Sequence, residues 1–237
     1  MATIFEAWQG VLTRIRTAAA TSGRPPESVA LLAVGKTFPP EALRELYAAG
    51  QRDFGENYEQ ELTAKAAALA DLPELRWHFI GPLQSNKTRN VACQAAWVHS
   101  VARLKIAQRL AEQRPEHLPP LNVCIQVNVS GEASKSGVAP AELPALAHAV
   151  TQLPRLRLRG LMCVPEPDGD DERLTAQFAT LRRLKAALQH EGLALDTLSM
   201  GMSADLEPAI REGATIVRVG TALFGARTNP DRNPDKE

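Results

Sequence analysis

Cysteine is scarce in this sequence, and the few cysteines lie far apart. Only Cys93, Cys124 and Cys163 occur, and they form no C-x-x-C pair. An odd number at such separations does not suit the disulfide framework of a small secreted domain. None of the five histidines lies at ligand spacing from a cysteine, which argues against a structural zinc site. We therefore expect no metal, and reduced, mostly buried thiols of the kind found in cytosolic proteins.

The sequence also lacks an excess of one charge and a long apolar run. Lysine plus arginine and aspartate plus glutamate number 27 each, so the formal net charge is zero. A protein that binds nucleic acid would normally carry a basic excess. No stretch approaches the ~18 apolar residues of a membrane helix, and the N-terminus lacks the apolar core of a signal peptide. These absences favour a cytoplasmic protein that binds neither nucleic acid nor membrane.

What the sequence does contain is a regular alternation of apolar strands and amphipathic helices. The run 28–36 is almost wholly apolar before its last two residues, which is typical of a strand buried on both faces. Eight such strands are expected, near residues 28–36, 52–57, 76–81, 97–100, 122–128, 157–163, 197–200 and 215–219. Each is followed by a helix, which predicts an α/β fold, a single (β/α)8 TIM barrel. No G-x-G-x-x-G motif follows the first strand, as a doubly wound dinucleotide-binding sheet would require.

The domain organisation is expected to be simple. No linker or shift in composition divides the chain, so residues 1–228 are predicted to form one domain. Apolar residues recur at helical spacing between Ile4 and Ile15, so residues 1–22 are predicted to form an extra N-terminal helix packed on the barrel. Residues 229–237 hold two prolines, several charges and no apolar residue, and we expect a disordered tail there.

Polar residues gather where the predicted strands end, and in a barrel these ends meet on the face that carries the chemistry. Lys36 has three interpretations: a surface lysine whose stem covers apolar surface, a cation that binds an anion, or an amine that forms a Schiff base. His78 is either a group that stacks on or bonds to a ligand or a satisfied core histidine. Asn57 is either a site residue or a turn residue.

Two of the predicted strand ends have the composition of phosphate-binding turns. Gly201 and Ser203 form one pair, and Gly220 and Thr221 form the other, each a glycine with a hydroxyl residue at a helix start. Helix N-termini bind anions, and barrels often hold phosphate after strands 7 and 8. Each turn alone has a structural explanation as a cap or tight turn, but together they favour phosphate. Arg218 could bind phosphate, carboxylate or a ring nitrogen, or form a surface salt bridge.

Five motifs, in order along the chain, carry a resemblance to a known family. They are AVGKT at 33–37, FGENY at 54–58, WHFIGPLQSNK at 77–87, LSMGMSAD at 198–205 and VRVGTALFG at 217–225. From about residue 30 to residue 225 the sequence closely resembles the pyridoxal phosphate homeostasis proteins, which bind pyridoxal 5′-phosphate (PLP). The resemblance implies a barrel like the N-terminal domain of alanine racemase (PLP fold type III). It also implies that Lys36 holds PLP as a Schiff base.

The resemblance assigns the other cofactor-binding residues as well. It places the phosphate on Ser203, Gly220 and Thr221, with Met200 and Gly201 close by, the pyridine nitrogen opposite Arg218, and Asn57 and His78 in the pocket lining. It assigns no metal ligand and no separate catalytic residue.

The assigned Arg218 limits the chemistry that we expect. A pyridine nitrogen facing a permanent cation stays unprotonated, so the ring is a weak electron sink. Racemisation needs an acid or base on each face of the substrate, and alanine racemases take one, a tyrosine, from a second domain. This sequence ends where that domain would begin, and only Tyr47 and Tyr58 are present.

We therefore predict a monomeric, non-catalytic PLP-binding protein of intracellular PLP homeostasis, which could serve PLP-requiring apoenzymes. The alternative is a weakly active PLP-dependent amino-acid racemase. A third class is a barrel that binds a phosphorylated metabolite through an ion pair with Lys36 and forms no imine.

Overall fold

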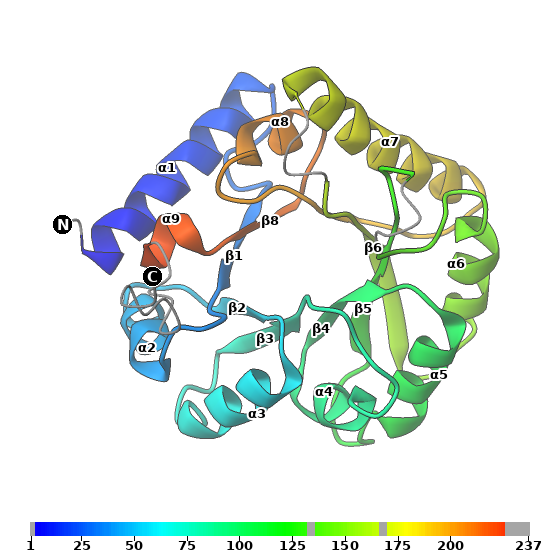
Figure 1. The fold of residues 1–237 in the computed structure, drawn as a ribbon, viewed down its shortest axis with the longest axis horizontal. Coiled ribbons are helices and arrows are strands. Elements are labelled where there is room, and N and C mark those ends of the chain that lie inside the picture. The colour runs from blue at the N-terminus through cyan, green and yellow to red at the C-terminus, as the bar shows by residue number, and fades with distance from the viewer. Residues whose placement is uncertain (1–2, 132–135, 166–169, 226–237) are drawn as a thin grey trace, which may run out of the picture.

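The structure is a closed barrel of eight parallel strands surrounded by helices (Figure 1). It is a computed structural model that describes residues 3–131, 136–165 and 170–225. The strands neighbour one another in sequence order, and β1 pairs with β8 to close the barrel. The predicted (β/α)8 barrel is therefore confirmed. The predicted tail at 229–237 lies outside the described residues.

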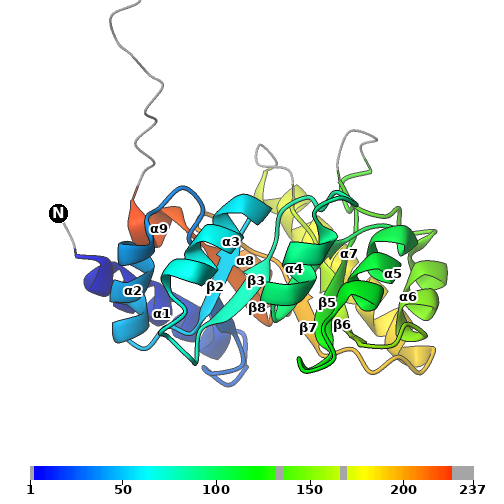
Figure 2. The same cartoon turned by 90° about the horizontal axis from the view of Figure 1, so that it is seen from below.

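The elements alternate as expected. The strands are β1 (Ala30–Val34), β2 (Asp53–Glu56), β3 (Arg76–Phe79), β4 (Trp97–Val101), β5 (Leu121–Gln126), β6 (Leu156–Met162), β7 (Thr197–Ser199) and β8 (Ile216–Val219). The helices are α1 (Ile4–Thr21), α2 (Pro40–Ala48), α3 (Glu59–Ala68), α4 (Thr88–Gln94), α5 (Leu104–Gln113), α6 (Leu143–Thr151), α7 (Asp171–His190), α8 (Leu206–Arg211) and α9 (Thr221–Phe224). Seen from the side, the helices form a layer around the strands (Figure 2).

The first helix precedes the barrel and packs on its outside. Thr3 and Glu6 form a capping box, in which each side chain bonds the other residue's backbone N–H. The buried residues Val11, Ile15 and Ala18 lie on one face of α1. This helix lies against α8 and α9, which come from the other end of the chain (Figure 1).

The strand ends differ from the sequence prediction in one respect that affects the site. β1 ends at Val34, so Lys36 lies in the loop after the strand and is not its last residue. Gly35 still donates its N–H to Gly55 of β2, but the chain then turns, because Phe38 N–H bonds back to Gly35. Thr37 within this turn has a φ of 70°, in the left-handed region. Lys36 therefore lies within a tight turn that follows β1.

The cysteine prediction holds for two of the three residues. Cys124 and Cys163 are buried, and burial raises the pKa of each thiol to about 12, so both stay protonated. Cys93 is exposed. All three are free thiols.

Candidate functional site

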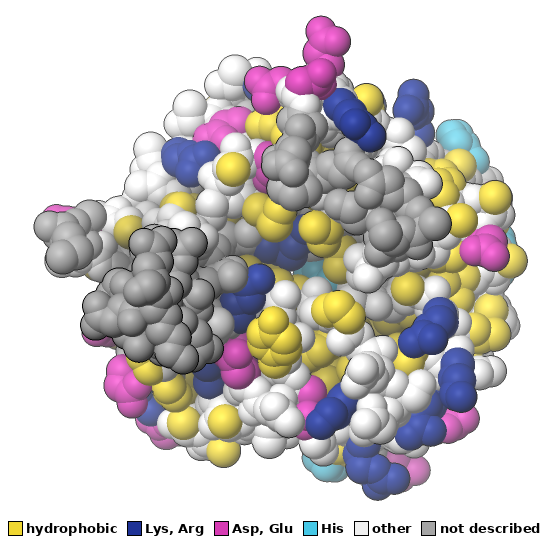
Figure 3. Space-filling view, viewed as in Figure 1, with side chains coloured by type: hydrophobic (Ala, Val, Ile, Leu, Met, Phe, Trp, Pro, Cys, Tyr) yellow, Lys and Arg dark blue, Asp and Glu magenta, His cyan; other side chains and the backbone are white. Residues whose placement is uncertain are grey.

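A cavity of about 310 Å³ opens where the strands end. Its size falls within the usual range for small-molecule sites. It is lined by Val34, Lys36, Phe38, Asn57, Ile80, Val164, Met202, Ser203, Ala204, Arg218, Gly220 and Thr221. Figure 3 shows this face of the barrel, with Lys or Arg side chains beside a central hollow.

Six of the nine sequence-predicted site residues meet in this cavity. They are Lys36, Asn57, Ser203, Arg218, Gly220 and Thr221. They come from the ends of β1, β2, β7 and β8, which are far apart in the sequence. The parallel barrel brings these ends to one face, as the sequence analysis assumed.

The turn after β7 depends on Gly201, which supports the cavity from behind. Gly201 has a φ of 94°, and a Cβ there would lie 2.6 Å from the Cβ of Ala209 on α8. Met200 and Gly201 are both buried and do not line the cavity. Met202 and Ser203 take that place instead. The first two residues shape the turn, and the next two face the cavity.

Ser203 joins the two turns that the sequence suggested for phosphate. Its Oγ accepts a hydrogen bond from the backbone N–H of Ala222 on α9, at 3.3 Å. The structural alternative, in which Ser203 caps α8, does not apply, because Asp205 holds the N-cap position of that helix. Gly220 packs against β1, where an added Cβ would lie 3.1 Å from the carbonyl oxygen of Val34. A side chain at position 220 would therefore crowd the end of β1.

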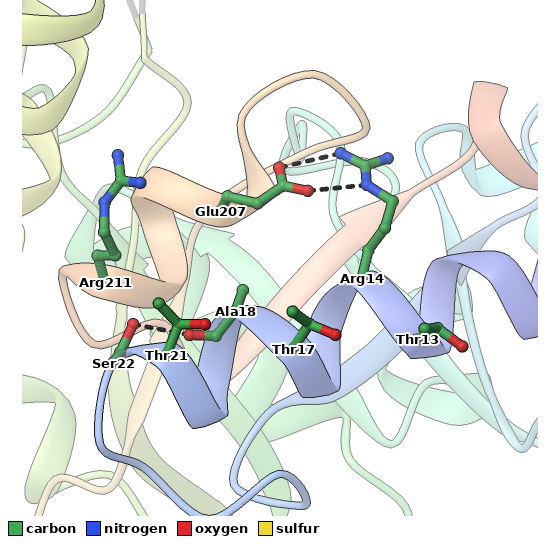
Figure 4. Close-up of a pocket in the computed structure, with 8 residues that line it drawn as sticks. All are labelled: Thr13, Arg14, Thr17, Ala18, Thr21, Ser22, Glu207 and Arg211. Carbon is green, nitrogen blue, oxygen red and sulfur yellow. Dashed lines mark hydrogen bonds and ion pairs between the residues drawn. The ribbon is translucent and has the colours of Figure 1, made fainter.

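A groove on the outside of the barrel is lined by Arg14, which contacts the turn that contains Ser203. It lies between α1 and α8, and Figure 4 shows Arg14 and Glu207 facing each other across it. Arg14 forms a bidentate ion pair with Glu207 and also donates to the carbonyl oxygen of Ser203, at 3.1 Å. The N-terminal helix thus holds the Ser203 turn from outside.

Asn57, which lines this cavity and the neighbouring one, carries a buried acceptor. Its Oδ1 has no hydrogen-bond partner within the described residues. Buried polar atoms are normally paired, so an unpaired acceptor in a cavity lining fits a ligand that supplies a donor. The Asn57 backbone is tightly packed, since a Cβ on Gly81 would lie 2.0 Å from its carbonyl oxygen.

Arg218 is a buried cation at the floor of the cavity. It is 5% exposed, and its Nη atoms donate to the carbonyl oxygens of Ser199 (2.6 Å) and Cys163 (2.8 Å). Within the described ranges, no carboxylate lies at ion-pair distance from it. Burial lowers the pKa of Arg218 from its ordinary value, but a guanidinium stays charged in proteins. The site therefore holds a fixed positive charge.

A chain of hydrogen bonds runs from Arg218 through the inside of the barrel. Its Nη1 donates to Ser199 Oγ at 3.0 Å, and that oxygen lies 2.7 Å from Nδ1 of His99. Nε2 of His99 lies 2.9 Å from Nδ1 of His78, whose own Nε2 lies 3.0 Å from Oδ1 of Asp53. Ser199 and both imidazoles are buried, so the chain is closed to water over most of its length.

The directions of these bonds follow from the protonation of the two imidazoles. Burial lowers the pKa of His78 and lowers that of His99 well below its ordinary value, which favours neutral rings. Arg218 can only donate, and the Asp53 carboxylate can only accept. With neutral rings, His78 then donates Nε2–H to Asp53, His99 donates Nε2–H to His78, and Ser199 donates its hydroxyl proton to His99.

The expectation that His78 lines the pocket has to be corrected. His78 lines a separate cavity of about 400 Å³ with Asp53, Arg76 and Trp97. Its ring stacks on Trp97 at 5.6 Å between centroids, and its Nε2 reaches Asp53, the first residue of β2. The ring therefore points toward the strand starts, and of the two alternatives His78 is the satisfied core histidine.

The two tyrosines lie outside the cavity lining. Tyr47 is on α2, beneath the guanidinium of Arg52 at 4.1 Å. Tyr58 is 59% exposed and lines a neighbouring cavity that shares Asn57. Neither phenol belongs to the residues that surround Lys36 and Arg218.

Sequence reasoning missed the residues that support the site from within. His99 and Ser199 were passed over because each looked like an ordinary strand residue. The signal was alternation: His99 lies two residues after Trp97, which pairs with His78, so its side chain enters the barrel on the same side as His78. Lys65 was missed because it lies on α3 and not at a strand end, and Glu56 was missed because it ends β2 with its carboxylate buried against Lys65.

The described residues hold no helix long and apolar enough to cross a membrane. They also hold no group of three or more His, Cys, Asp or Glu side chains that could bind a metal ion.

Comparisons with known proteins agree with this geometry. The family model described as alanine racemase, N-terminal domain, matches residues 13–228. A pyridoxal phosphate homeostasis protein of Pseudomonas aeruginosa is 66% identical over 227 residues, which cover 96% of this chain and 97% of the relative. The Escherichia coli protein of the same name is 53% identical and is matched over 92% of this chain and 94% of its own length.

Solved structures give the same result. PipY of Synechococcus elongatus, determined with PLP bound, is 45% identical with a TM-score of 0.78, covering 89% of this chain and 98% of PipY. Alanine racemase of Corynebacterium glutamicum, at 18% identity and a TM-score of 0.68, shares the fold over 92% of this chain and 62% of its own. On this sequence identity and coverage, the chain belongs to the family of pyridoxal phosphate homeostasis proteins, and its residues 13–228 belong to the domain family described as alanine racemase, N-terminal domain.

Proposed function

We propose that this protein binds PLP in the central cavity, holds it through a Schiff base to Lys36, and serves in intracellular PLP homeostasis. The observation that carries the proposal is the meeting of Lys36, Arg218 and the turns at Ser203 and Thr221 in one cavity. The names of the relatives and the PLP bound to PipY support it.

The residues present fit the cofactor. PLP supplies an aldehyde that condenses with a primary amine and releases water, and Lys36 supplies the amine. The hydroxyls of Ser203 and Thr221 can donate to the phosphate, while Gly220 keeps the backbone free of a side chain there. Arg218 would offer a permanent donor to the pyridine nitrogen.

The same residues favour holding the cofactor over turning over a substrate. A nitrogen that accepts from Arg218 stays unprotonated, which weakens the ring as an electron sink. No tyrosine lines the cavity to serve as a second acid or base.

We further propose that the protein acts as a cytoplasmic monomer that could supply PLP-requiring apoenzymes. A weak amino-acid racemase is the second candidate, favoured by the shared fold.

Borohydride reduction tests the Schiff base. We expect reduction of the PLP-loaded protein to fix the cofactor on the peptide that contains Lys36, as located by mass mapping. Lys36→Ala should lose that adduct but keep some affinity for PLP through the phosphate turns. Lys87→Ala is the control, since this half-buried lysine lies near the neighbouring cavity. A reduced wild-type protein without label on Lys36 contradicts the proposal.

Removing the two hydroxyls tests the phosphate turns. Ser203→Ala combined with Thr221→Ala should weaken PLP binding at least about tenfold, because a hydrogen bond to a charged group contributes about 1.5–3 kcal/mol. Unchanged affinity would disprove this assignment.

An assay of interconversion between D- and L-amino acids separates the carrier from the racemase. Turnover that disappears in Lys36→Ala would favour the enzyme.

A further inference from the structure

We propose that Lys65, with Glu56 and Glu61, positions Lys36 and thereby sets how fast and how completely its amine captures an aldehyde. The proposal rests on the proposed function, because it concerns the same amine. It assigns a role to three charged residues that do not line the cavity.

Lys65 lies behind β1 and uses all three of its donors. Its side chain on α3 is 6% exposed. Its Nζ lies 2.7 Å from the carbonyl oxygen of Gly35, 2.8 Å from Oε1 of Glu56 and 2.8 Å from Oε2 of Glu61. An ammonium group has three protons, so these three bonds satisfy it and fix its place.

The cluster holds the backbone on both sides of Lys36. Lys65 binds the carbonyl group of Gly35, which belongs to the peptide bond entering Lys36. Glu61 Oε2 accepts from the N–H of Thr37, at 2.8 Å, which belongs to the peptide bond leaving Lys36. One charged cluster therefore fixes both peptide groups that flank the Lys36 Cα.

The turn needs such support because its backbone is unfavourable. Thr37 is β-branched and has a φ of 70°, a conformation that costs about 1–3 kcal/mol and persists only where its surroundings hold it. The backbone at Gly35 is packed closely against the cluster, since a Cβ there would lie 2.8 Å from Glu56 Oε1. Without the cluster, the turn could relax and move Lys36.

The cluster is also costly to bury. Glu56 is fully buried, and its Oε2 has no partner within the described residues. Replacing a buried ion pair by apolar side chains of similar size is often neutral or stabilising. Stability alone therefore gives little reason for a lysine and a glutamate here. Their contacts with the peptide groups beside Lys36 supply a reason.

Lys65→Met is the direct test, because methionine keeps much of the length and loses the charge and the donors. The first measurement is the rate of imine formation after mixing with PLP, followed by absorbance. The second is the affinity for pyridoxine 5′-phosphate, which has the ring and phosphate but an alcohol in place of the aldehyde. We expect imine formation to slow about tenfold or more, since small misplacements of a reacting group cost up to ~10²-fold. The affinity for the alcohol should change less than about twofold, because the phosphate turns and Arg218 are untouched.

Two further variants keep the test decisive. Lys185→Met removes a half-buried lysine on α7 that lines no part of the cavity, and should match the wild type in both measurements. Glu61→Ala removes the partly exposed acceptor that Thr37 and Lys65 share but leaves the bond from Lys65 to Gly35, and should show a smaller loss in the same direction if Lys65→Met does not fold.

The outcomes distinguish this inference from the proposed function. If the wild-type protein forms no reducible adduct on Lys36, the proposed function fails and the inference with it. If the wild type forms the adduct but Lys65→Met and Glu61→Ala behave like it, only the inference fails. If in both variants the affinity for pyridoxine 5′-phosphate and the rate of imine formation fall by the same factor, the cluster supports the whole site and does not position Lys36. That result also overturns the inference.

Discussion

The carboxyl group of Glu56 should make the protein less stable as the pH rises toward neutrality. Burial raises the pKa of Glu56 to about 7, and the ion pair with Lys65 only partly opposes that effect. In the unfolded chain the same group has its ordinary pKa of 4.5. Between these two values the folded protein binds more protons than the unfolded chain. Stability from this group is therefore present below pH 4.5 and is lost as the pH rises through about 7.

The size of the effect follows from the two pKa values. The interval from 4.5 to about 7 corresponds to about 3 kcal/mol, at ~1.4 kcal/mol per pH unit. Two histidines act in the opposite direction over part of this range. Burial lowers the pKa of both His78 and His99, so the unfolded chain binds the extra protons there and stability rises with pH. The whole protein's pH profile therefore mixes both signs, and a matched variant is needed.

Glu56→Gln isolates the carboxyl group, because glutamine keeps the acceptor and cannot ionise. Urea unfolding of both proteins at intervals from about pH 4.5 to about pH 8 gives the difference in free energy of unfolding, in which the histidines cancel. We expect the wild type to lose about 3 kcal/mol relative to the variant across this range.

Glu207→Gln is the control, since the ion pair with Arg14 outweighs burial and lowers the pKa of Glu207, which does not contact Glu56. Its difference from the wild type should stay flat above about pH 5.5 and shrink only below 4.5. A Glu56→Gln difference that stays constant, or that moves in favour of the wild type with rising pH, would refute the reasoning.

Two further predictions concern the supports of the barrel and the cavity. Although burial opposes it, hydrogen bonds from His78 and an arginine lower the pKa of Asp53 to about 2. Asp53→Asn should therefore cost about 2 kcal/mol above pH 4, a difference that fades as the pH falls toward 2 and is measured by urea unfolding. Gly81→Ala should cost about 1–3 kcal/mol and weaken PLP binding, because the new Cβ must push the Asn57 carbonyl away. Gly10→Ala, with no atom within 4 Å of the added Cβ, should leave both the melting temperature and the PLP titration unchanged or slightly improved.

The fold was predictable because its signals are local. Each buried strand is a short apolar run, and each helix shows its own apolar face, so the count of alternating units could be read without knowing any contact. The positions of the residues that follow the strands could be predicted from the same alternation of strands and helices. Lys36, Ser203 and Thr221 share a cavity because parallel strands in a barrel all end on one face, which topology alone guarantees.

The errors came from features that depend on the stagger between strands. His78 lies on a strand whose end was expected to face the pocket, yet its ring bonds to Asp53 at the start of β2. The height of a side chain inside a barrel depends on the registers of all the strands around it, and no local pattern contains that information. The position of Lys65 is similar. An Ala-rich helix gives little sign that its lysine turns inward.

The two basic groups of the cavity are held in different ways, and the difference fits their proposed tasks. Lys36 is held through the peptide groups on either side of it, by Lys65 and Glu61. Arg218 is fixed through its side chain, by two carbonyl oxygens and the Ser199 hydroxyl. These three bonds use three of the five N–H donors of a guanidinium, so two donors remain that no protein group takes within the described residues. The neutral chain behind Ser199 ends at the distant Asp53 and supplies no nearby counter-ion. A ligand with an acceptor nitrogen can pair one of these donors while its phosphate reaches the turns at Ser203 and Thr221, whereas a phosphorylated metabolite with no acceptor for Arg218 would leave that donor unpaired, at a cost of about 1–3 kcal/mol.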